Sequence, residues 1–203
     1  MPDLAAALRA VLPPRVGLGQ GRDAPLWPGE DVPGAVPARR AEFVAGRAAA
    51  REAMRGLGVA PAAVPMNPDR SPAWPHGLTG SISHCADACL AIVGRRADFA
   101  GLGLDIEPAR ALDPGLWPVI LRPDEATVDP LAVFVAKEAA YKAQYAVTGA
   151  LFDFHTLSVG LAGDRFTAAF RTNVGPFACG HVLHGRLIRT ARHIAAICVL
   201  TAS

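Results

Sequence analysis

The sequence predicts an α+β protein made of two similar halves, each with one long helix and a small antiparallel sheet. Two Ala-rich segments, residues 37–57 and 131–149, have helical periodicity, and short segments that alternate apolar and polar residues follow each of them. The two helical segments also resemble each other, because residues 41–58 and 132–149 are identical at seven of eighteen positions. A helix followed by strands, twice over, predicts two half-domains related by a pseudo-twofold axis, with a functional site at their interface.

The first half, residues 1–100, begins with a short predicted helix over residues 3–12, which Pro13 and Pro14 end. A connection rich in Pro and Gly leads to the long helix at 37–57, which Gly58 stops. The next twenty residues contain five prolines and are expected to be irregular. Two strands then follow, at Thr79–His84 and Cys89–Val93.

The second half, residues 101–203, starts within a strand over residues 100–108 that alternates strictly and ends at Pro108. A loop over residues 108–130, with a short helix near Asp124, leads to the helix at 131–149. Three more strands are expected, at Thr156–Leu161, Arg165–Arg171 and Ile194–Thr201.

The helix at 131–149 places two charged residues, Glu138 and Lys142, in the middle of its apolar stripe. Leaving such a charge buried without a partner costs several kcal/mol. The two residues are spaced i,i+4, so they could form an ordinary helix pair worth about 0.3–0.5 kcal/mol. Because such pairs usually stand opposite the apolar face, the pattern favours a functional site.

The strand at 100–108 brings two carboxylates, Asp105 and Glu107, to one face, where they repel each other unless a cation lies between them. Gly101 and Gly103 precede them on that face and would let a ligand approach the backbone. Together with Glu138 they offer three hard oxygen donors, which suit Mg²⁺ shared with substrate phosphates. The alternative is a solvated strand face, since an isolated Asp-x-Glu is a weak signal.

The helix at 37–57 has arginines, namely Arg40, Arg47 and Arg51, beside Val44 and Met54 on its apolar stripe. In the internal alignment Arg47 stands opposite Glu138, and Arg51 stands opposite Lys142. One interpretation is snorkelling, with packed aliphatic stems and guanidinium groups in water. The other is that this half presents guanidinium groups to phosphate across a shared cleft, since the arginine fork donates bidentate hydrogen bonds.

The segment Gly80-Ser-Ile-Ser-His84 adds hydroxyls and an imidazole at the end of a strand. Such groups can donate hydrogen bonds to phosphate oxygens, or they can be turn residues that cap the next element. This short segment alone does not decide between the two.

Four segments in order resemble the signatures of 4′-phosphopantetheinyl transferases of the surfactin and enterobactin-synthase type. They are RRAEFVAGRAAAREAMRGLG, WPHGLTGSISH, GLGLDIEP and FVAKEAAYKA. The resemblance runs from about Pro25 to Phe154. It implies a monomer of two α+β halves that moves 4′-phosphopantetheine from coenzyme A to a serine of an apo acyl, peptidyl or aryl carrier protein, as in siderophore or other secondary metabolite synthesis. Adenosine 3′,5′-bisphosphate leaves.

The resemblance also implies roles for the residues singled out above. Asp105, Glu107 and Glu138 are expected to hold Mg²⁺, and Lys142 is expected to contact the pyrophosphate of coenzyme A. Glu138 is the candidate base, although its roles as metal ligand and as base remain alternatives. The residues expected to bind coenzyme A are Arg40, Arg47, Arg70, Ser83, His84 and Lys142.

Composition limits other functions. The net charge of +2 is too small to indicate nucleic acid binding, and no apolar run is long enough to span a membrane. The N-terminus lacks the features of a signal peptide, so we expect a cytoplasmic protein. The four cysteines are expected to be reduced, and a metal cluster of His84, Cys85 and Cys89 lacks a fourth ligand.

Two functions from other classes remain possible at this stage. A Mg²⁺-dependent phosphohydrolase of coenzyme A-like nucleotides would explain the carboxylates but not the arginine helix or the internal repeat. A non-catalytic module that binds coenzyme A or a carrier protein would not require Glu138 and Lys142, and both are present.

Overall fold

The computed structural model of the chain describes residues 3–125 and 129–202. Met1, Pro2 and Ser203, at the ends of the two predicted halves, lie outside the described residues, as do residues 126–128 of the predicted loop.

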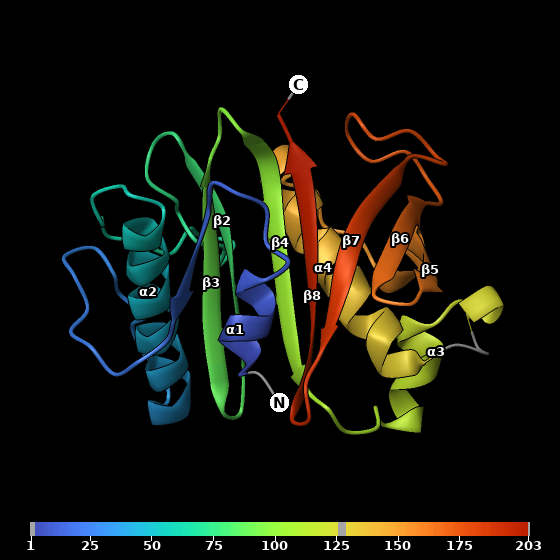
Figure 1. The fold of residues 1–203 in the computed structure, drawn as a ribbon, viewed down its shortest axis with the longest axis horizontal. Coiled ribbons are helices and arrows are strands. Elements are labelled where there is room, and N and C mark those ends of the chain that lie inside the picture. The colour runs from blue at the N-terminus through green and yellow to red at the C-terminus, as the bar shows by residue number, and fades with distance from the viewer. Residues whose placement is uncertain (1–2, 126–128, 203) are drawn as a thin grey trace.

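Two antiparallel sheets lie side by side, and a long helix packs on each of them (Figure 1). The first sheet has the strand order β1-β3-β2 and the second has the order β4-β8-β7-β6-β5. The first half contains α1 (Leu4–Arg9), β1 (Val16–Gln20), α2 (Pro37–Gly56), β2 (Leu78–Cys85) and β3 (Ala88–Arg95). The remainder contains β4 (Phe99–Pro108), α3 (Trp117–Ile120), α4 (Pro130–Thr148), β5 (Leu157–Ala162), β6 (Arg165–Phe170), β7 (Val182–Arg189) and β8 (His193–Thr201), with short 3₁₀ turns at Pro114–Leu116, Pro123–Glu125 and Phe154–Thr156.

The predicted α+β class is confirmed, and both long helices lie within a residue of their predicted ends. Helix α4 ends at Gly149, whose φ of 63° is the left-handed conformation that glycine adopts without strain. Two strands were not predicted. Strand β1 lies in a segment that was predicted to be a connection, and no strand was predicted at β7. The pseudo-twofold axis stays a prediction.

Side chains of β2 join the two sheets. The Leu104 amide donates to Ser81 Oγ at 3.0 Å, and the Ile106 amide donates to Ser83 Oγ at 3.1 Å. Two buried serines therefore satisfy backbone donors of β4 that face the first sheet. This junction holds β4, which carries the predicted carboxylates, against β2.

Pairs of glycines allow each long helix to lie directly on a strand. A Cβ on Gly17 or Gly19 of β1 would stand 2.0 Å from Ala53 O and 2.1 Å from Ala49 O of α2, respectively. On β4, a Cβ on Gly101 or Gly103 would stand 2.1 Å from Ala143 O and 1.8 Å from Ala139 O of α4. Gly101 and Gly103 therefore serve the approach of a helix, whereas the sequence analysis assigned them to the approach of a ligand.

These equivalent contacts also correct the internal alignment. Ala49 and Ala139 stand 90 residues apart, as do Ala53 and Ala143, whereas the sequence alignment used an offset of 91. In the register of the structure, Arg47 of α2 corresponds to Lys137 of α4 and not to Glu138.

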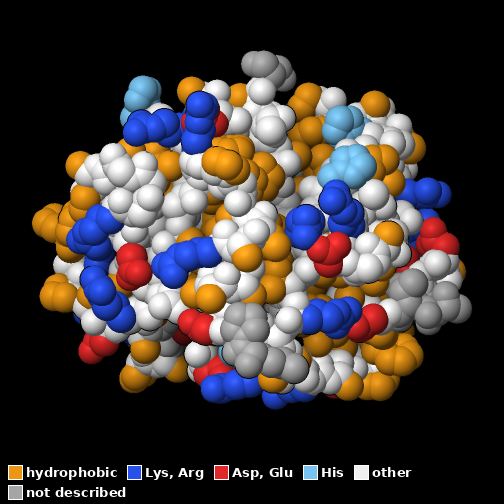
Figure 2. All heavy atoms as spheres, viewed as in Figure 1, with side chains coloured by type: hydrophobic (Ala, Val, Ile, Leu, Met, Phe, Trp, Pro, Cys, Tyr) orange, Lys and Arg blue, Asp and Glu red, His pale blue; other side chains and the backbone are white. Residues whose placement is uncertain are grey.

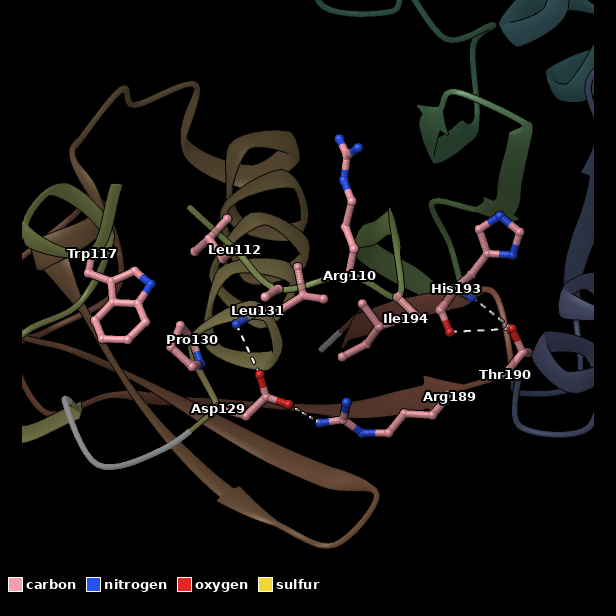
Figure 3. Close-up of a pocket in the computed structure, with 12 residues that line it drawn as sticks. Arg110, Leu112, Trp117, Asp129, Pro130, Leu131, Arg189, Thr190, His193 and Ile194 are labelled. Carbon is pink, nitrogen blue, oxygen red and sulfur yellow. Dashed lines mark hydrogen bonds and ion pairs between the residues drawn. The ribbon is translucent and has the colours of Figure 1, made fainter. Parts of the chain in front are cut away.

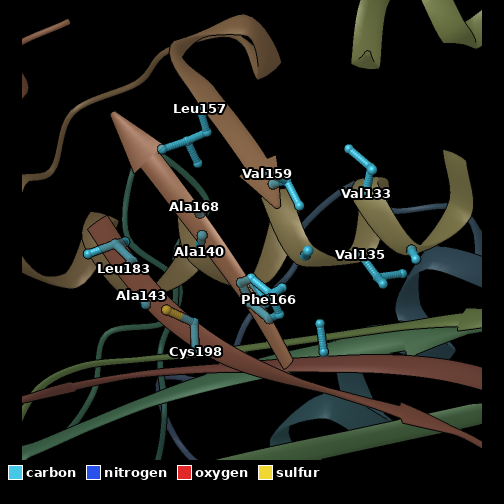
Figure 4. Packing of buried hydrophobic residues seen from close by; sticks show 14 of the residues in the cluster. Val133, Val135, Ala140, Ala143, Leu157, Val159, Phe166, Ala168, Leu183 and Cys198 are labelled. Carbon is cyan, nitrogen blue, oxygen red and sulfur yellow. The ribbon is translucent and has the colours of Figure 1, made fainter. Parts of the chain in front are cut away.

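Three groups of buried apolar residues hold the fold together. One lies between α4 and strands β5 to β8, and Figure 4 shows Val135 and Ala140 of α4 among Val159, Phe166 and Cys198. A second lies under α2. The third includes side chains of α1, β1 and β3 together with those of β4 and β8, so it belongs to both predicted halves.

The described helices include none that is both long and apolar enough to cross a bilayer. On the face of the molecule seen in Figure 2, cationic and anionic side chains are interspersed. This distribution fits the small net charge of +2.

Candidate active site

Asp105 is the centre of the site, where β4 meets β2 and α4. Its Oδ1 accepts from Ser83 Oγ at 3.0 Å and from Lys142 Nζ at 2.7 Å. Asp105 is only 5% exposed, so it is buried and does not lie on an open cleft wall. Its Oδ2 is buried and has no hydrogen-bond partner among the described residues. A buried carboxylate oxygen without a partner is costly, and a bound cation would satisfy it.

Lys142 links α4 to this carboxylate. Its ammonium also donates to Leu104 O at 3.1 Å and lies 3.4 Å from Ser83 Oγ. No ion pair within 4.0 Å joins Lys142 to Glu138 among the described residues, so the ordinary i,i+4 helix pair is not formed. The partner of Lys142 comes from another element, as expected for a site.

Glu107 and Glu138 lie beside Asp105, and burial is the main cause that raises the pKa of each. The charge of Asp105 adds to the rise in both, while Lys142 opposes it. The three carboxylates are thus close enough to repel one another, and the positive charge of Lys142 offsets only part of this repulsion. Their oxygens do not all lie within 4.8 Å of one another, so they form an open and not a closed set of ligands.

A cavity of about 480 Å³ lies between the loop before β2, strand β2 and α4. Its wall includes Arg70 and Trp74 from the loop before β2, Ser81 from β2, and Lys142 and Tyr145 from α4. Tyr145 OH donates to Asp69 Oδ2 and so connects the loop to α4. Tyr145 is on the predicted stripe, but the sequence offered no signal that pointed to Asp69 as its partner.

Glu138 lines a separate cavity of about 200 Å³ on the neighbouring side of α4, together with Tyr141 and Phe152. Lys142 and Glu138 therefore line two different but adjoining spaces. Tyr141 lies between these spaces and contributes to the walls of both.

Two arginines of α2, Arg47 and Arg51, are buried and bonded within the protein. Arg47 Nε donates to Val64 O at 2.6 Å, its guanidinium lies 3.9 Å from the centre of the Phe43 ring, and burial lowers its pKa to about 10. Arg51 pairs with the buried Glu30 and lies over the Trp27 ring. Snorkelling is therefore wrong for these two side chains. Their contacts hold neighbouring loops, so the assignment of Arg47 to coenzyme A stays a prediction.

The other residues predicted to bind coenzyme A lie in different parts of the structure. Ser83 is buried at the β2–β4 junction, where it positions Asp105. His84 is half-buried near Arg39 and Glu42 of α2, and burial is the main cause that lowers its pKa. Arg40 is exposed on the first turns of α2, and Arg70 lines the large cleft with a φ of 70°.

Lys137, a residue not singled out from the sequence, is fully enclosed beside Glu138. It pairs with the buried Glu125 at 2.7 Å and donates to Ile120 O at 2.8 Å, and burial is the main cause that lowers its pKa. Glu125 also accepts from the Val159 amide. This buried pair fastens the segment after β4 to α4, directly beside Glu138.

Another cavity, of about 330 Å³, lies at the start of α4 (Figure 3). There Asp129 caps the helix by accepting from the Leu131 amide at 3.1 Å and pairs with Arg189 of β7 at 2.8 Å. Trp117 lies at one side of this space and His193 at the other. It is separate from the Asp105 cluster in the residues that line it.

An ammonium, a buried aspartate with a free oxygen and two further carboxylates can bind a cation together with an anionic substrate. Such a combination is typical of enzymes that transfer phosphate-containing groups, in which charge neutralisation and positioning supply most of the catalysis.

Comparison with known proteins gives the family. Residues 28–94 match the family described as "4'-phosphopantetheinyl transferase N-terminal domain". The chain is 37% identical to 4'-phosphopantetheinyl transferase Svp of Streptomyces mobaraensis over 79% of this chain and 71% of that protein. It is 37% identical to 4'-phosphopantetheinyl transferase PptT of Mycobacterium tuberculosis over 66% of each. It is 42% identical to enterobactin synthase component D of Salmonella typhimurium over 52% of this chain and 48% of that protein.

The chain therefore belongs to the 4′-phosphopantetheinyl transferase family, and the resemblance drawn from its sequence motifs is confirmed. It is a transferase. The roles of individual side chains are a separate matter that rests on the geometry described above.

Proposed function

We propose that this enzyme transfers 4′-phosphopantetheine from coenzyme A to a serine hydroxyl of an apo carrier protein at the Asp105–Lys142 cluster. The single observation that carries the assignment to this cluster is the buried Asp105. One of its oxygens is held by Lys142 at 2.7 Å, and the other has no partner among the described residues. An enzyme that binds a pyrophosphate with a cation needs both features in one place.

Coenzyme A is assigned to the cleft between the halves. Cationic side chains in its wall include Arg70 from the loop before β2 and Lys142 from α4. Trp74 offers an aromatic face in the same wall, which suits a nucleotide base. His84 and Arg40 lie nearer α2, where they would contact an anionic end of the molecule that extends from the cleft.

The residues present fit a Mg²⁺ ion. The unpartnered Asp105 Oδ2 and the carboxylates of Glu107 and Glu138 are hard oxygen donors, and the open arrangement of the three leaves room for waters and substrate oxygens. When bound, the ion would polarise the pyrophosphate and neutralise charge on the leaving group.

The chain's own residues then divide the remaining work. Lys142 donates to the pyrophosphate as a compact positive charge, and Ser83 fixes the orientation of Asp105. The serine oxygen of the carrier attacks phosphorus, and the bond to the bridging oxygen breaks. Adenosine 3′,5′-bisphosphate leaves. Glu138 receives the serine proton, as the alternative to its place among the metal ligands.

The arrangement of the two halves, residues 1–100 and 101–203, belongs to this proposal. Each half places a strand containing Gly-Leu-Gly under its long helix, and in each a buried basic residue of that helix donates to a backbone carbonyl outside it. These repeated contacts support two related units that share the cleft. The enzyme is proposed to act as a monomer in the cytoplasm.

The carrier protein is proposed to be of the acyl, peptidyl or aryl type. Some relatives are named as a component of enterobactin synthase, which supports a role in siderophore or related secondary metabolite synthesis. The carrier's docking side is not assigned here to particular residues.

The test is mass spectrometry of an apo carrier protein incubated with the enzyme, coenzyme A and Mg²⁺. We expect the carrier to gain the phosphopantetheine arm and adenosine 3′,5′-bisphosphate to appear in equal amount. Free bisphosphate with an unmodified carrier would indicate a phosphohydrolase instead. No product at all, with coenzyme A still bound, would indicate a non-catalytic binding module.

A second experiment places coenzyme A. The sequence contains only two lysines, and Lys137 is 1% exposed whereas the side chain of Lys142 is 27% exposed. An amine-reactive label should therefore modify Lys142 in preference to Lys137, with the terminal amine as an internal reference. Coenzyme A should protect Lys142 from the label, and unchanged labelling would contradict the assignment of the cleft.

A further inference from the structure

A second group of metal-binding side chains lies away from the Asp105 cluster. Cys85 is the last residue of β2, Asp87 lies in the β2–β3 turn, and His193 is the first residue of β8. The cysteine sulfur, a carboxylate oxygen and a ring nitrogen all lie within 4.8 Å of one another. The transfer reaction proposed above uses none of these residues.

The distances within the group favour one metal ion shared by the three side chains. His193 Nε2 lies 2.8 Å from Asp87 Oδ1, and Cys85 Sγ lies 3.7 Å from the same oxygen. An ion with bonds of about 2.0–2.3 Å to S, N and O in tetrahedral geometry separates its ligand atoms by about 3.3–3.7 Å. The sulfur–oxygen distance of 3.7 Å already has this spacing, whereas Nε2 and Oδ1 are hydrogen-bonded at 2.8 Å and would have to move about 0.5 Å apart around an ion.

A simple hydrogen bond between His193 and Asp87 would not need the thiol. The contact of Cys85 with Asp87 is long, and a thiol is a weak donor, so that contact contributes little by itself. Arg192 pairs with Asp87 Oδ2 and leaves Oδ1 directed at the sulfur and the imidazole. An outer partner of this kind typically orients a metal-binding carboxylate.

The surroundings allow an ion to enter. Asp87 and His193 belong to the wall of a cavity of about 300 Å³ that also includes Gln20 and Cys89. His193 is 8% exposed and extends between this cavity and the one shown in Figure 3, where it lies beside Thr190. Three protein ligands would leave a fourth position for water on the cavity side.

We propose that Cys85, Asp87 and His193 bind a Zn²⁺ ion that joins the β2–β3 turn of the first half to the β7–β8 turn of the second. A thiolate and an imidazole with one carboxylate select zinc-like ions, whereas the all-oxygen set around Asp105 selects Mg²⁺. Because the ligands come from both halves, the ion stabilises their contact and raises the unfolding temperature.

The test uses Co²⁺ as the probe, since it binds in zinc sites and gives an intense near-ultraviolet charge-transfer band when a thiolate is a ligand. The full-length protein is titrated with Co²⁺ in the presence of excess Mg²⁺, which occupies carboxylate sites. We expect the thiolate band to appear, to be removed by Zn²⁺, and to be accompanied by a rise in Tm. Coordination by carboxylates alone would give no such band, and its absence would overturn the proposal.

Matched variants identify the ligands. Cys85→Ser and His193→Gln should lower the Co²⁺ affinity by more than the ~10–100-fold typical of losing an outer partner. Cys89→Ser, in the neighbouring position that lines the same cavity, should leave the band and the affinity unchanged. Circular dichroism checks that each variant is folded. A band that survives Cys85→Ser, or one that is lost in Cys89→Ser, would contradict the site.

Discussion

Helices α2 and α4 carry the same kind of stripe, with charged side chains among apolar ones, but the two sets of charges do different work. On α2, Arg47 and Arg51 are buried and bonded to Val64 O and to Glu30, respectively. On α4, Lys142 stays partly exposed at a cleft and pairs with Asp105, one oxygen of which has no hydrogen-bond partner in the described part of the chain. A charged residue on the apolar stripe of a helix therefore indicates a functional site only when the group that pairs with it still has an atom without a hydrogen bond.

The glycine contacts explain how the difference arises. In the register that they define, Arg47 corresponds to Lys137. Arg47 donates to the carbonyl of Val64 in a loop, and Lys137 donates to the carbonyl of Ile120 at the end of α3. Glu138 and Lys142 then correspond to Ala48 and Glu52 of α2. The two charged residues of α4 that we propose for catalysis therefore have no equivalent of the same kind on α2.

The largest effect on stability is expected at the buried ion pair of α2. Arg51→Met leaves Glu30 buried without its partner and should lower the free energy of unfolding by about 3–5 kcal/mol, measured by urea denaturation. Arg55→Met, at an exposed position of the same helix, is the control and should change it by less than about 0.5 kcal/mol. Equal small effects would mean that the α2 charges are not structural.

On α4 the largest effect should fall on catalysis. Lys142→Met removes the positive charge opposite the leaving group and should slow single-turnover transfer by about 10²–10³-fold. The variant also leaves the buried Asp105 without its ammonium, so circular dichroism checks that it is folded before its rate is compared. Lys142→Arg retains the charge and should recover part of the rate, and a Lys142→Met variant with normal turnover would make the cation merely structural.

Arg47 is the residue for which the two helices are most directly compared. Arg47→Met should lower the free energy of unfolding by about 1–3 kcal/mol through loss of the bond to Val64 O, with little change in coenzyme A affinity. Affinities for coenzyme A and for dephospho-coenzyme A, measured by calorimetry, provide the check. Weaker binding of coenzyme A alone, with unchanged stability, would instead place Arg47 at the 3′-phosphate.

The predicted elements that were found and those that were missed have physical reasons. Helix α4 was predictable because its capping and periodicity are local, with Asp129 before it and Gly149 after it. Strand β1 was missed because it lies in a segment rich in Pro and Gly, which was predicted to be a connection. Here Gly17 is required by the carbonyl of Ala53, which is a contact of the folded state. In β7, Gly185 likewise makes room for the Phe166 ring, and Leu187-Ile188 interrupts the alternation.

The site was predictable in its residue types but not in its pairing. The spacing of Asp105, Glu107, Glu138 and Lys142 indicated a cation and an anionic ligand, and the structure brings these residues together at the β2–β4 junction. The Lys142–Asp105 pair and the role of Ser83 depend on contacts between distant segments. The same holds for Glu30 and Val64, which occupy the arginines of α2.

A smaller effect is expected at Glu138, where a neutral substitution should raise stability and lower transfer activity. Because its pKa is raised in the folded state, the ionised carboxylate costs stability as pH rises above the ordinary value of 4.5, and the cost is complete above the raised pKa. Glu138→Gln should therefore raise Tm in EDTA at neutral pH by about 2–4 °C per kcal/mol relieved, with no gain at pH below the ordinary value. Differential scanning calorimetry provides the measurement, and the exposed Asp31→Asn is the control. A lower Tm for Glu138→Gln at neutral pH would contradict the raised pKa. The transfer activity of this variant should fall in either case.

Asp105 allows the most direct test of the proposed site, because its two oxygens are claimed to serve Lys142 and a cation at once. Asp105→Asn keeps the size of the side chain and removes its charge, so the β2–β4 junction should remain folded. Single-turnover transfer to an apo carrier protein is followed by mass spectrometry across a Mg²⁺ titration, with the unmodified enzyme alongside. We expect the variant to leave the carrier unmodified at every Mg²⁺ concentration. Near-normal turnover of the variant in saturating Mg²⁺ would contradict the central claim, and the metal and the chemistry would then belong elsewhere in the protein.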